Sequence, residues 1–307
     1  MTGFFTGLYH RNGAFMATFM LAGVAFWIVF LIVLPQLAML DFSLRYDLPP
    51  SKLGGPEDVY TLDNYKFFLF GHPGNSDGWN YVDLRVFART IVAAAMVTVL
   101  NLAICYPIAY YLAQSASGAG ARAIAIALIV PYWINEILRA FAFRIIFGDV
   151  GVINSVLKLS GLVDQSIDFV RMDVALYAGL TYAYLLLMIF PLYNAIESLD
   201  RNQIEAARDL GAPWWRIHKD VVMPYAKPGI AAGCTMVFML SAGSLAAPQF
   251  LGGPRTLWFT SIVYDFFFQA FNWPRGAAYA FILLAACIAF VMLLLRLFKV
   301  SLGETIK

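Results

Sequence analysis

Long runs of residues without any Asp, Glu, Lys or Arg dominate this chain of 307 residues. A helix needs about 20 apolar residues to cross the roughly 30 Å hydrocarbon core of a bilayer. Five runs reach that length, with 29, 32, 23, 27 and 20 residues. In chain order they are 12–40, 90–121, 174–196, 228–254 and 276–295. Each of these runs therefore predicts one transmembrane helix.

A sixth, shorter run predicts an additional and unusual span. Residues 123–135 contain 13 uncharged residues, and segments 118–121 and 137–147 extend them on both sides. Only 13% of the chain is charged, whereas ordinary soluble domains contain about 25%. The sequence thus predicts an all-α polytopic membrane protein with six transmembrane helices in one domain, 1–307. The first run is too long for the apolar region of a signal peptide, so we interpret it as the first span.

The distribution of basic residues favours one orientation in the membrane. Six spans place both termini on the same side. If that side is the cytoplasm, the inner segments carry 10 Lys and Arg in 66 residues, and the outer segments carry 11 in 117. This difference in density agrees with the positive-inside rule. The inner segments are then 1–14, 114–122, 197–227 and 296–307. The net charge of +2 gives no reason to expect binding to nucleic acid.

The polar segment between the fourth and fifth spans has a regular internal pattern. Glu205-Ala206-Ala207 is followed by three residues, Gly211, nine further residues and then Val221-Val222-Met223-Pro224. Asp200 suits the N-cap of a first helix, and Gly211 suits the position just after it, where a positive φ costs little. Pro213 is then expected to begin a second helix and Pro224 to end it. The pattern predicts two short helices that meet at a glycine elbow. An ordinary surface helix with a loop would share these local features.

This spacing resembles the EAA motif of permease subunits in bacterial ABC importers. The family pattern is E-A-A, three residues, G, nine residues and I-x-L-P; here Val221 and Met223 replace the Ile and Leu. Residues 131–154 and 271–284 also resemble permeases of spermidine/putrescine importers. The resemblance covers roughly residues 85–300, whereas the first 80 residues share only the family's layout.

The resemblance implies a fold, a location and a set of partners. The fold would be that of a type I ABC importer permease, in the bacterial inner membrane with both termini cytoplasmic. The partners would be a second, homologous permease in a heterodimer, two copies of an ABC ATPase and a periplasmic substrate-binding protein. ATP and Mg would be bound by the ATPase, and this chain would need no cofactor. The transported solute would be spermidine, putrescine or a related small organic cation. Amino-acid derivatives, opines and other amines are the alternatives.

In that family the loop between the two helices docks into a cleft on the ATPase. Segment 197–227 would then be the coupling loop, with ATPase-coupling residues Glu205, Ala206, Ala207, Asp209, Gly211 and Pro224. Closure of the ATPase would pull on this elbow and turn the cavity outward by alternating access.

Five residues are candidates for the translocation pathway: Trp133, Glu136, Tyr182, Tyr184 and Asp265. Ionisable groups at the end of a span need water, a partner or a cavity. Glu136 precedes Arg139 by three residues, so it either forms an interfacial ion pair or lines an outward-facing vestibule. The two tyrosines lie deep in the fourth span, where a polar lumen or a neighbouring helix would have to satisfy their hydroxyls. A polyamine would be attracted to both a carboxylate and an aromatic face.

A stretch rich in proline and glycine interrupts the fifth apolar run. It includes Pro248, Gly252 and Gly253, and irregular backbone within a membrane is tolerated only where it is buried in protein or faces water. We interpret it as a gate over the pathway or as a plain exit loop. Segment 41–89 is expected outside, either as a docking surface for the binding protein or as a self-packed cap. The core spans are expected within 90–300.

The sequence offers no catalytic or metal-binding set. The three histidines, His10, His72 and His218, are far apart in the chain and lack the spacing of a metal-binding helix. The phosphate-binding pattern G-x-x-x-x-G-K-[ST] is absent, and so is the nucleophile pattern G-x-S-x-G. The three cysteines lie in apolar runs and are expected to be packing residues. A non-enzymatic subunit is therefore predicted. A secondary transporter is the weaker alternative, because matching broken helices in two halves are not evident.

Overall fold

The computed structural model describes residues 13–52, 54–71, 78–115, 118–254 and 256–299. Regular structure within these ranges is helical, apart from one isolated bridge between Arg45 and Tyr60. The chain divides into two compact units. One comprises Met1–Asn80 and Asp265–Phe281, and the other comprises Tyr81–Tyr264 and Ile282–Lys307. The predicted all-α class is confirmed.

Five helices in the described ranges are long and apolar enough to cross a membrane. They are Phe15–Ser43, Tyr81–Ser115, Val174–Glu197, Trp214–Gly243 and Trp273–Phe298. Each overlaps one of the five longest uncharged runs. The second begins at Tyr81, earlier than the predicted residue 90, because a helix continues past the apolar core when its charged end can reach water.

The predicted sixth span is divided into three short helices. These are α6 (Gly118–Ile129), the 3₁₀ turn η4 (Val130–Trp133) and α7 (Glu136–Ile146). The break falls at Asn135, whose side-chain oxygen accepts a hydrogen bond from the Ile137 N–H at 2.9 Å and so caps α7. Glu136 is thereby placed in the first turn of α7, at the end of the helix that favours a carboxylate.

The first unit contains the N-terminal span and the polar segment that follows it. Its elements are α2 (Ala14–Ile28), the π-helix η1 (Val29–Val33), α3 (Leu34–Ser43), η2 (Pro50–Lys52) and α4 (Asp63–Phe70). The segment is held by Arg45, which pairs with Asp41 and with Asp58, each at 2.7 Å. The Gly54 backbone N–H and the Arg45 guanidinium hold the pKa of Asp58 below its usual value. This part of segment 41–89 is therefore internally ordered.

Aromatic residues of that segment pack within the same unit. Phe68 is buried against the Tyr279 ring at 5.5 Å, and the Arg275 guanidinium lies 3.9 Å above the Phe67 ring. Tyr60 and Phe70 are exposed instead. Part of the aromatic cluster is thus packed within the unit, and part of it is exposed.

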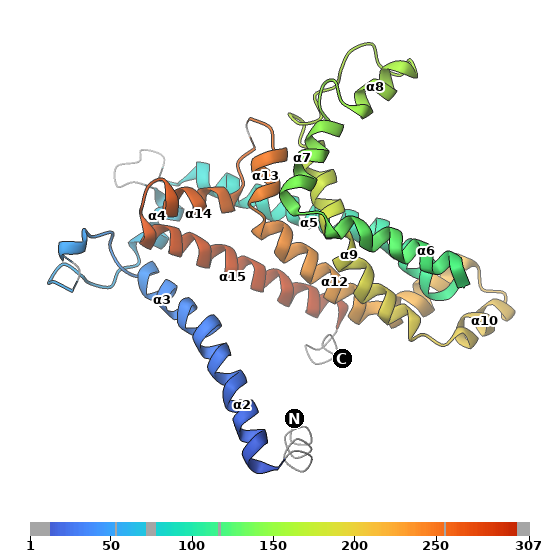
Figure 1. The fold of residues 1–307 in the computed structure, drawn as a ribbon, viewed down its shortest axis with the longest axis horizontal. Helices are drawn as coiled ribbons and strands as arrows, with labels where there is room; N and C mark the ends of the chain where they lie inside the picture. Colours follow the sequence, from blue (N-terminus) through green and yellow to red (C-terminus); the bar gives the residue numbers. More distant parts are fainter. Residues whose placement is uncertain (1–12, 53, 72–77, 116–117, 255, 300–307) are drawn as a thin grey trace. The chain divides into compact units, whose positions relative to one another are not determined.

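Three long helices form the centre of the second unit (Figure 1). They are α5 (Tyr81–Tyr110), α9 (Val174–Glu197) and α12 (Met223–Gly243), and each packs on the other two. Glycine permits the closest contacts, because a Cβ on Gly229 would lie 2.4 Å from the Pro191 carbonyl oxygen. Small residues allow membrane helices to approach in this way.

Shorter elements join and cover these three helices. They are η3 (Tyr111–Ser115), α8 (Val152–Leu159), α10 (Arg201–Asp209), α11 (Trp214–Ile217), η5 (His218–Val222) and α13 (Ala246–Leu251). Two further helices, α14 (Phe259–Phe268) and α15 (Trp273–Phe298), contain residues of both units.

Two boundaries near prolines differ from the prediction. Pro224 does not end a helix: it lies in the first turn of α12, directly after the π-helix η5. A proline is tolerated at the first or second position of a helix, because the N–H at these positions needs no partner within the helix. The wide π turn of η5 precedes Pro224, so the helical backbone continues into α12. The fifth span ends at Gly243, before Pro248, and Pro248 itself lies within α13.

Candidate functional site

The predicted elbow between α10 and α11 is present. The Asp200 side chain accepts a hydrogen bond from the Asn202 N–H at 3.0 Å, which caps α10. Gly211 has a φ of 77°, and its N–H donates to the Arg208 carbonyl at 2.9 Å. The N–H of Ala212 donates to the Ala207 carbonyl at 3.1 Å. These two bonds form a Schellman motif, in which a glycine with positive φ ends the helix.

The elbow presents an exposed surface that mixes apolar and acidic side chains. Leu210, Trp214 and Trp215 are 88%, 73% and 51% exposed. The predicted coupling residues Glu205, Ala206, Asp209, Gly211 and Pro224 are also exposed, and Ala207 is half-buried. Ile204 and Ile217 are buried and attach the two short helices to the rest of the unit. Exposed tryptophans beside a rigid turn are typical of a surface that binds another protein.

A first cavity, of about 520 Å³, lies where α7, α9, α12 and α13 meet. Its polar lining comes from the side chains of Glu136, Tyr184, Ser244 and Gln249. The Tyr184 hydroxyl donates to the Leu240 carbonyl at 3.2 Å. A neighbouring helix, α12, thus supplies the hydrogen-bond partner expected for one of the two tyrosines in the fourth apolar run. We call this space the outer cavity.

Buried hydroxyls occur on the helices that border the outer cavity, and one of them lines it. Among the described residues, Thr181, Ser241 and Ser244 each have a buried side-chain oxygen without a hydrogen-bond partner. Thr181 precedes Tyr184 by three residues, and Ser241 precedes Ser244 by three, so each pair shares a helix face or its end. Buried polar atoms normally have a hydrogen-bond partner, and Ser244 is the one of these three that lines the outer cavity.

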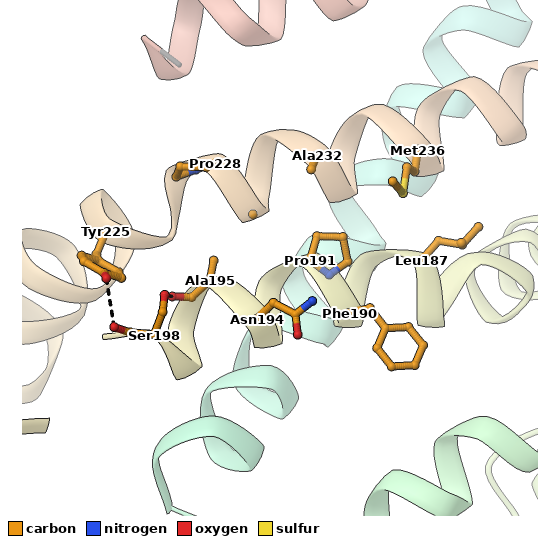
Figure 2. A pocket seen from close by; sticks show the side chains of 11 residues that line it. Leu187, Phe190, Pro191, Asn194, Ala195, Ser198, Tyr225, Pro228, Ala232 and Met236 are labelled. Carbon is orange, nitrogen blue, oxygen red and sulfur yellow. Dashed lines mark hydrogen bonds between the residues drawn. The ribbon is translucent and has the colours of Figure 1, made fainter. Parts of the chain in front are cut away.

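A second cavity, of about 560 Å³, lies between α9 and α12 (Figure 2). Figure 2 shows Phe190 and Asn194 on α9 and Met236 on α12 along its walls. The Tyr225 hydroxyl donates to the Ser198 carbonyl at 2.9 Å and closes one end. We call this space the inner cavity. Ser198 and Tyr225 in its lining flank residues 199–222, which we call the elbow segment.

The two cavities follow one another along the same pair of helices. On α9, Tyr184 lines the outer cavity and Leu187, three residues later, lines the inner one. On α12, Met239 lines the outer cavity and Met236, three residues earlier, lines the inner one. Residues three apart share a helix face, so one face of each helix borders both cavities.

The structure brings together only part of the predicted pathway set. Glu136 and Tyr184 line the outer cavity, but Trp133 is 87% exposed and is absent from its lining. Tyr182 lies instead in a separate, small cavity with Arg139, whose guanidinium is 6.0 Å from the Tyr182 ring. Asp265 lies on α14 and accepts a hydrogen bond from Gln269 at 2.8 Å.

Glu136 and Arg139 do not form the ion pair that their spacing suggested. Arg139 lies over the rings of Tyr132 and Tyr182, while the Glu136 carboxylate faces the outer cavity. Sequence reasoning missed Ser244 and Gln249. The two residues are five positions apart and lie on either side of a helix break, so no helical periodicity predicts that both line the same cavity.

A buried carboxylate lies beside one of the predicted gate residues, Gly253. The Asp173 side chain pairs with Arg89 on α5 and accepts a hydrogen bond from the Thr256 hydroxyl. The Gly253 N–H points toward the same carboxylate at 3.5 Å. Gly252 has no room for a Cβ, which would lie 2.4 Å from the Pro248 carbonyl oxygen. These contacts fix the segment that follows α13, next to the outer cavity.

The fold identifies the class of protein. It matches the crystal structure of a bacterial ABC transporter involved in the import of the acidic polysaccharide alginate, with a TM-score of 0.71. That match covers 95% of this chain and 96% of the other at 14% sequence identity. The chain therefore has the fold of an ABC importer permease.

Sequence similarity then places the chain in a family. Residues 106–300 match the binding-protein-dependent transport system inner membrane component family, and the chain belongs to this family. The spermidine/putrescine transport system permease protein PotB of Escherichia coli (strain K12) is 30% identical over 261 residues, covering 84% of this chain and 89% of that protein. PotB of Salmonella typhimurium (strain SL1344) is 31% identical over 254 residues, covering 82% and 83%. The chain is a multi-pass inner-membrane permease subunit, not an enzyme.

Proposed function

We propose that this chain is a permease subunit of an importer for spermidine, putrescine or a related small organic cation. The observation that carries the substrate assignment is the outer cavity, in which Glu136 is the only acidic or basic side chain among the described residues of the lining. A carboxylate in the lining favours an ammonium group and disfavours an anion. The PotB relatives are named as spermidine/putrescine permeases, which supports the same class of solute.

The remaining lining suits a flexible chain with several ammonium groups. The hydroxyls of Tyr184 and Ser244 and the amide of Gln249 offer oxygen acceptors around the carboxylate. Met239 and Phe250 offer the apolar contact that the methylene segments of a polyamine need. Other amines and opine-like compounds fit the same description and are the alternatives.

We place the elbow in the cytoplasm as the contact with the ATPase. The exposed surface formed by Leu210, Trp214 and Trp215 adjoins Glu205, Ala206, Ala207, Asp209, Gly211 and Pro224. The Schellman motif makes the turn rigid, so force applied to it reaches α12 without being absorbed locally. The full transporter would contain a second, homologous permease, two ATPase copies that bind ATP and Mg, and a periplasmic binding protein.

The membrane arrangement follows from this placement. Both termini would be cytoplasmic, and segment 41–89 would face the periplasm together with Pro248, Gly252 and Gly253. Residues 90–300 would contain the core spans that rock during alternating access. The outer and inner cavities would then be successive parts of one pathway between periplasm and elbow.

The proposal is tested on the assembled complex in membrane vesicles. The tagged chain should copurify with an ATPase, and vesicles should accumulate radiolabelled spermidine or putrescine only when ATP is present. Uptake of an anion such as molybdate, with none of either polyamine, would overturn the substrate assignment.

The elbow is tested with Gly211→Asp in the same vesicles. A Cβ at Gly211 meets nothing within 4 Å, although the φ of 77° strains any side chain there. The variant should insert normally yet lose at least about tenfold in uptake, because a charge enters the docking surface. Gly161→Asp is the matched control, since Gly161 also has a positive φ, 70°, and open space but lies after α8. Full uptake by Gly211→Asp would remove the coupling role of the elbow.

A further inference from the structure

The C-terminal end of α5 contacts both ends of the elbow segment. On one side Gln114, in η3, donates from Nε2 to the carbonyl of Ile196 at 2.8 Å and to that of Leu199 at 3.2 Å. These carbonyls stand at the end of α9, just before the Asp200 cap of α10. The entry to the elbow segment is therefore fixed to α5.

On the other side His218 fixes the exit. Its Nδ1 lies 2.8 Å from the Tyr106 hydroxyl, in a hydrogen bond between η5 and α5. The His218 ring also packs edge-on against Tyr110, with ring centroids 4.4 Å apart. These contacts join residues more than 100 positions apart in the chain, so they exist only in the folded unit.

The same imidazole contacts the exposed surface of the elbow. The Trp214 ring packs edge-on against His218 at 5.3 Å, and Trp214 is 73% exposed. His218 thus lies between a side chain that a partner protein can touch and two tyrosines of α5. A force on Trp214 has a direct, packed route into α5.

Two π-helical turns begin at or next to the residues of this contact. His218 is the first residue of η5, and Tyr110 directly precedes η3. A π turn contains more residues than an α turn and often marks a functional site, because one residue of register can be taken up or released there. Helix rotation can therefore be accommodated on both sides of the His218 contact.

We propose that His218 is a positioning residue that transmits movement of the elbow to α5, in addition to the direct connection through η5 and α12. This inference rests on the proposed coupling function. It predicts that loss of the His218–Tyr106 hydrogen bond lowers transport more than ATP hydrolysis. Substitution of a residue needed only for packing would lower both rates together.

The test measures radiolabelled spermidine or putrescine taken up per ATP hydrolysed by the whole complex in vesicles. Tyr106→Phe removes only the hydroxyl, and His218→Phe keeps a ring but removes Nδ1. Each should raise the ATP used per solute by about fivefold, the effect of one hydrogen bond. The double variant should show no more than either single change, because both remove the same bond. His218→Asn, with an amide near the position of Nδ1, should recover part of the coupling.

Tyr111→Phe is the matched control, since Tyr111 is 51% exposed in η3, directly after Tyr110, whereas the His218 contacts given above come from Tyr106 and Tyr110. An unchanged ratio in Tyr106→Phe, with normal amounts of assembled complex, would overturn the inference even if His218→Phe fails to assemble. Absence of a copurified ATPase from the unmodified complex would instead overturn the proposed function itself.

Discussion

Replacing Gly229 by alanine tests the close contact between α9 and α12. The new Cβ would lie 2.4 Å from the Pro191 carbonyl oxygen and 2.6 Å from the Ala195 Cβ. Real Cβ atoms essentially never approach closer than 3.0 Å, and the shortfall, 3.0 minus 2.4, is 0.6 Å. Because the nearest neighbour is backbone, the two helices themselves must move apart.

The expected loss of stability in Gly229→Ala follows from the distance by which α9 and α12 must move apart. A gap of about 0.5–1 Å forfeits roughly a quarter to a half of the dispersion energy between the atoms that face each other. Over-packing of a dense interior costs about 1–3 kcal/mol, and contact with backbone places Gly229→Ala at about 3 kcal/mol. For a unit of this size that corresponds to a fall of roughly 6–12 °C in the unfolding midpoint.

The assay is the thermal midpoint of the purified complex in one detergent, measured on a graded series of glycines from the same helix. Gly233→Ala meets the flexible Met188 Sδ at 2.7 Å and should cost less, because that side chain can turn away. Gly243→Ala meets nothing within 4 Å and should leave the midpoint unchanged. Equal midpoints for the Gly229 and Gly243 variants would refute the close approach of α9 to α12.

Two further predictions concern the outer cavity and the buried carboxylate near it. Glu136→Gln should weaken polyamine uptake by about tenfold or more at low substrate concentration, because a hydrogen bond to a charged group is lost. Copurification of the ATPase should be unchanged. Asp265→Asn is the comparison, and a larger loss of uptake in that variant would contradict the assignment of the cation site to Glu136. Asp173→Asn should lower the free energy of unfolding by about 2 kcal/mol through loss of the Arg89 pair, less than the usual cost of breaking a buried pair because Arg89 is 38% exposed. The double variant with Arg89→Gln should lose less stability than the two single variants together. Strict additivity of the shifts in unfolding midpoint would show that the pair contributes nothing.

The local features of the chain were readable from the sequence. The uncharged runs located five long spans, because a bilayer core tolerates few charges over about 20 residues. The elbow followed from Asp200 and Gly211, whose cap and positive φ depend only on neighbouring backbone groups. The motif spacing also indicated the family to which the chain belongs.

The arrangement of side chains between helices was decided only by the tertiary structure. Tyr182 and Tyr184 look equivalent in the sequence, yet only Tyr184 faces the outer cavity. A membrane helix that is apolar on every face carries no periodic signal to show which face meets a neighbour. The break at Asn135 and the link from His218 to Tyr106 likewise depend on packing between distant segments. Sequence therefore determined where the chain crosses the membrane and turns, and packing between helices determined which residues line the two cavities.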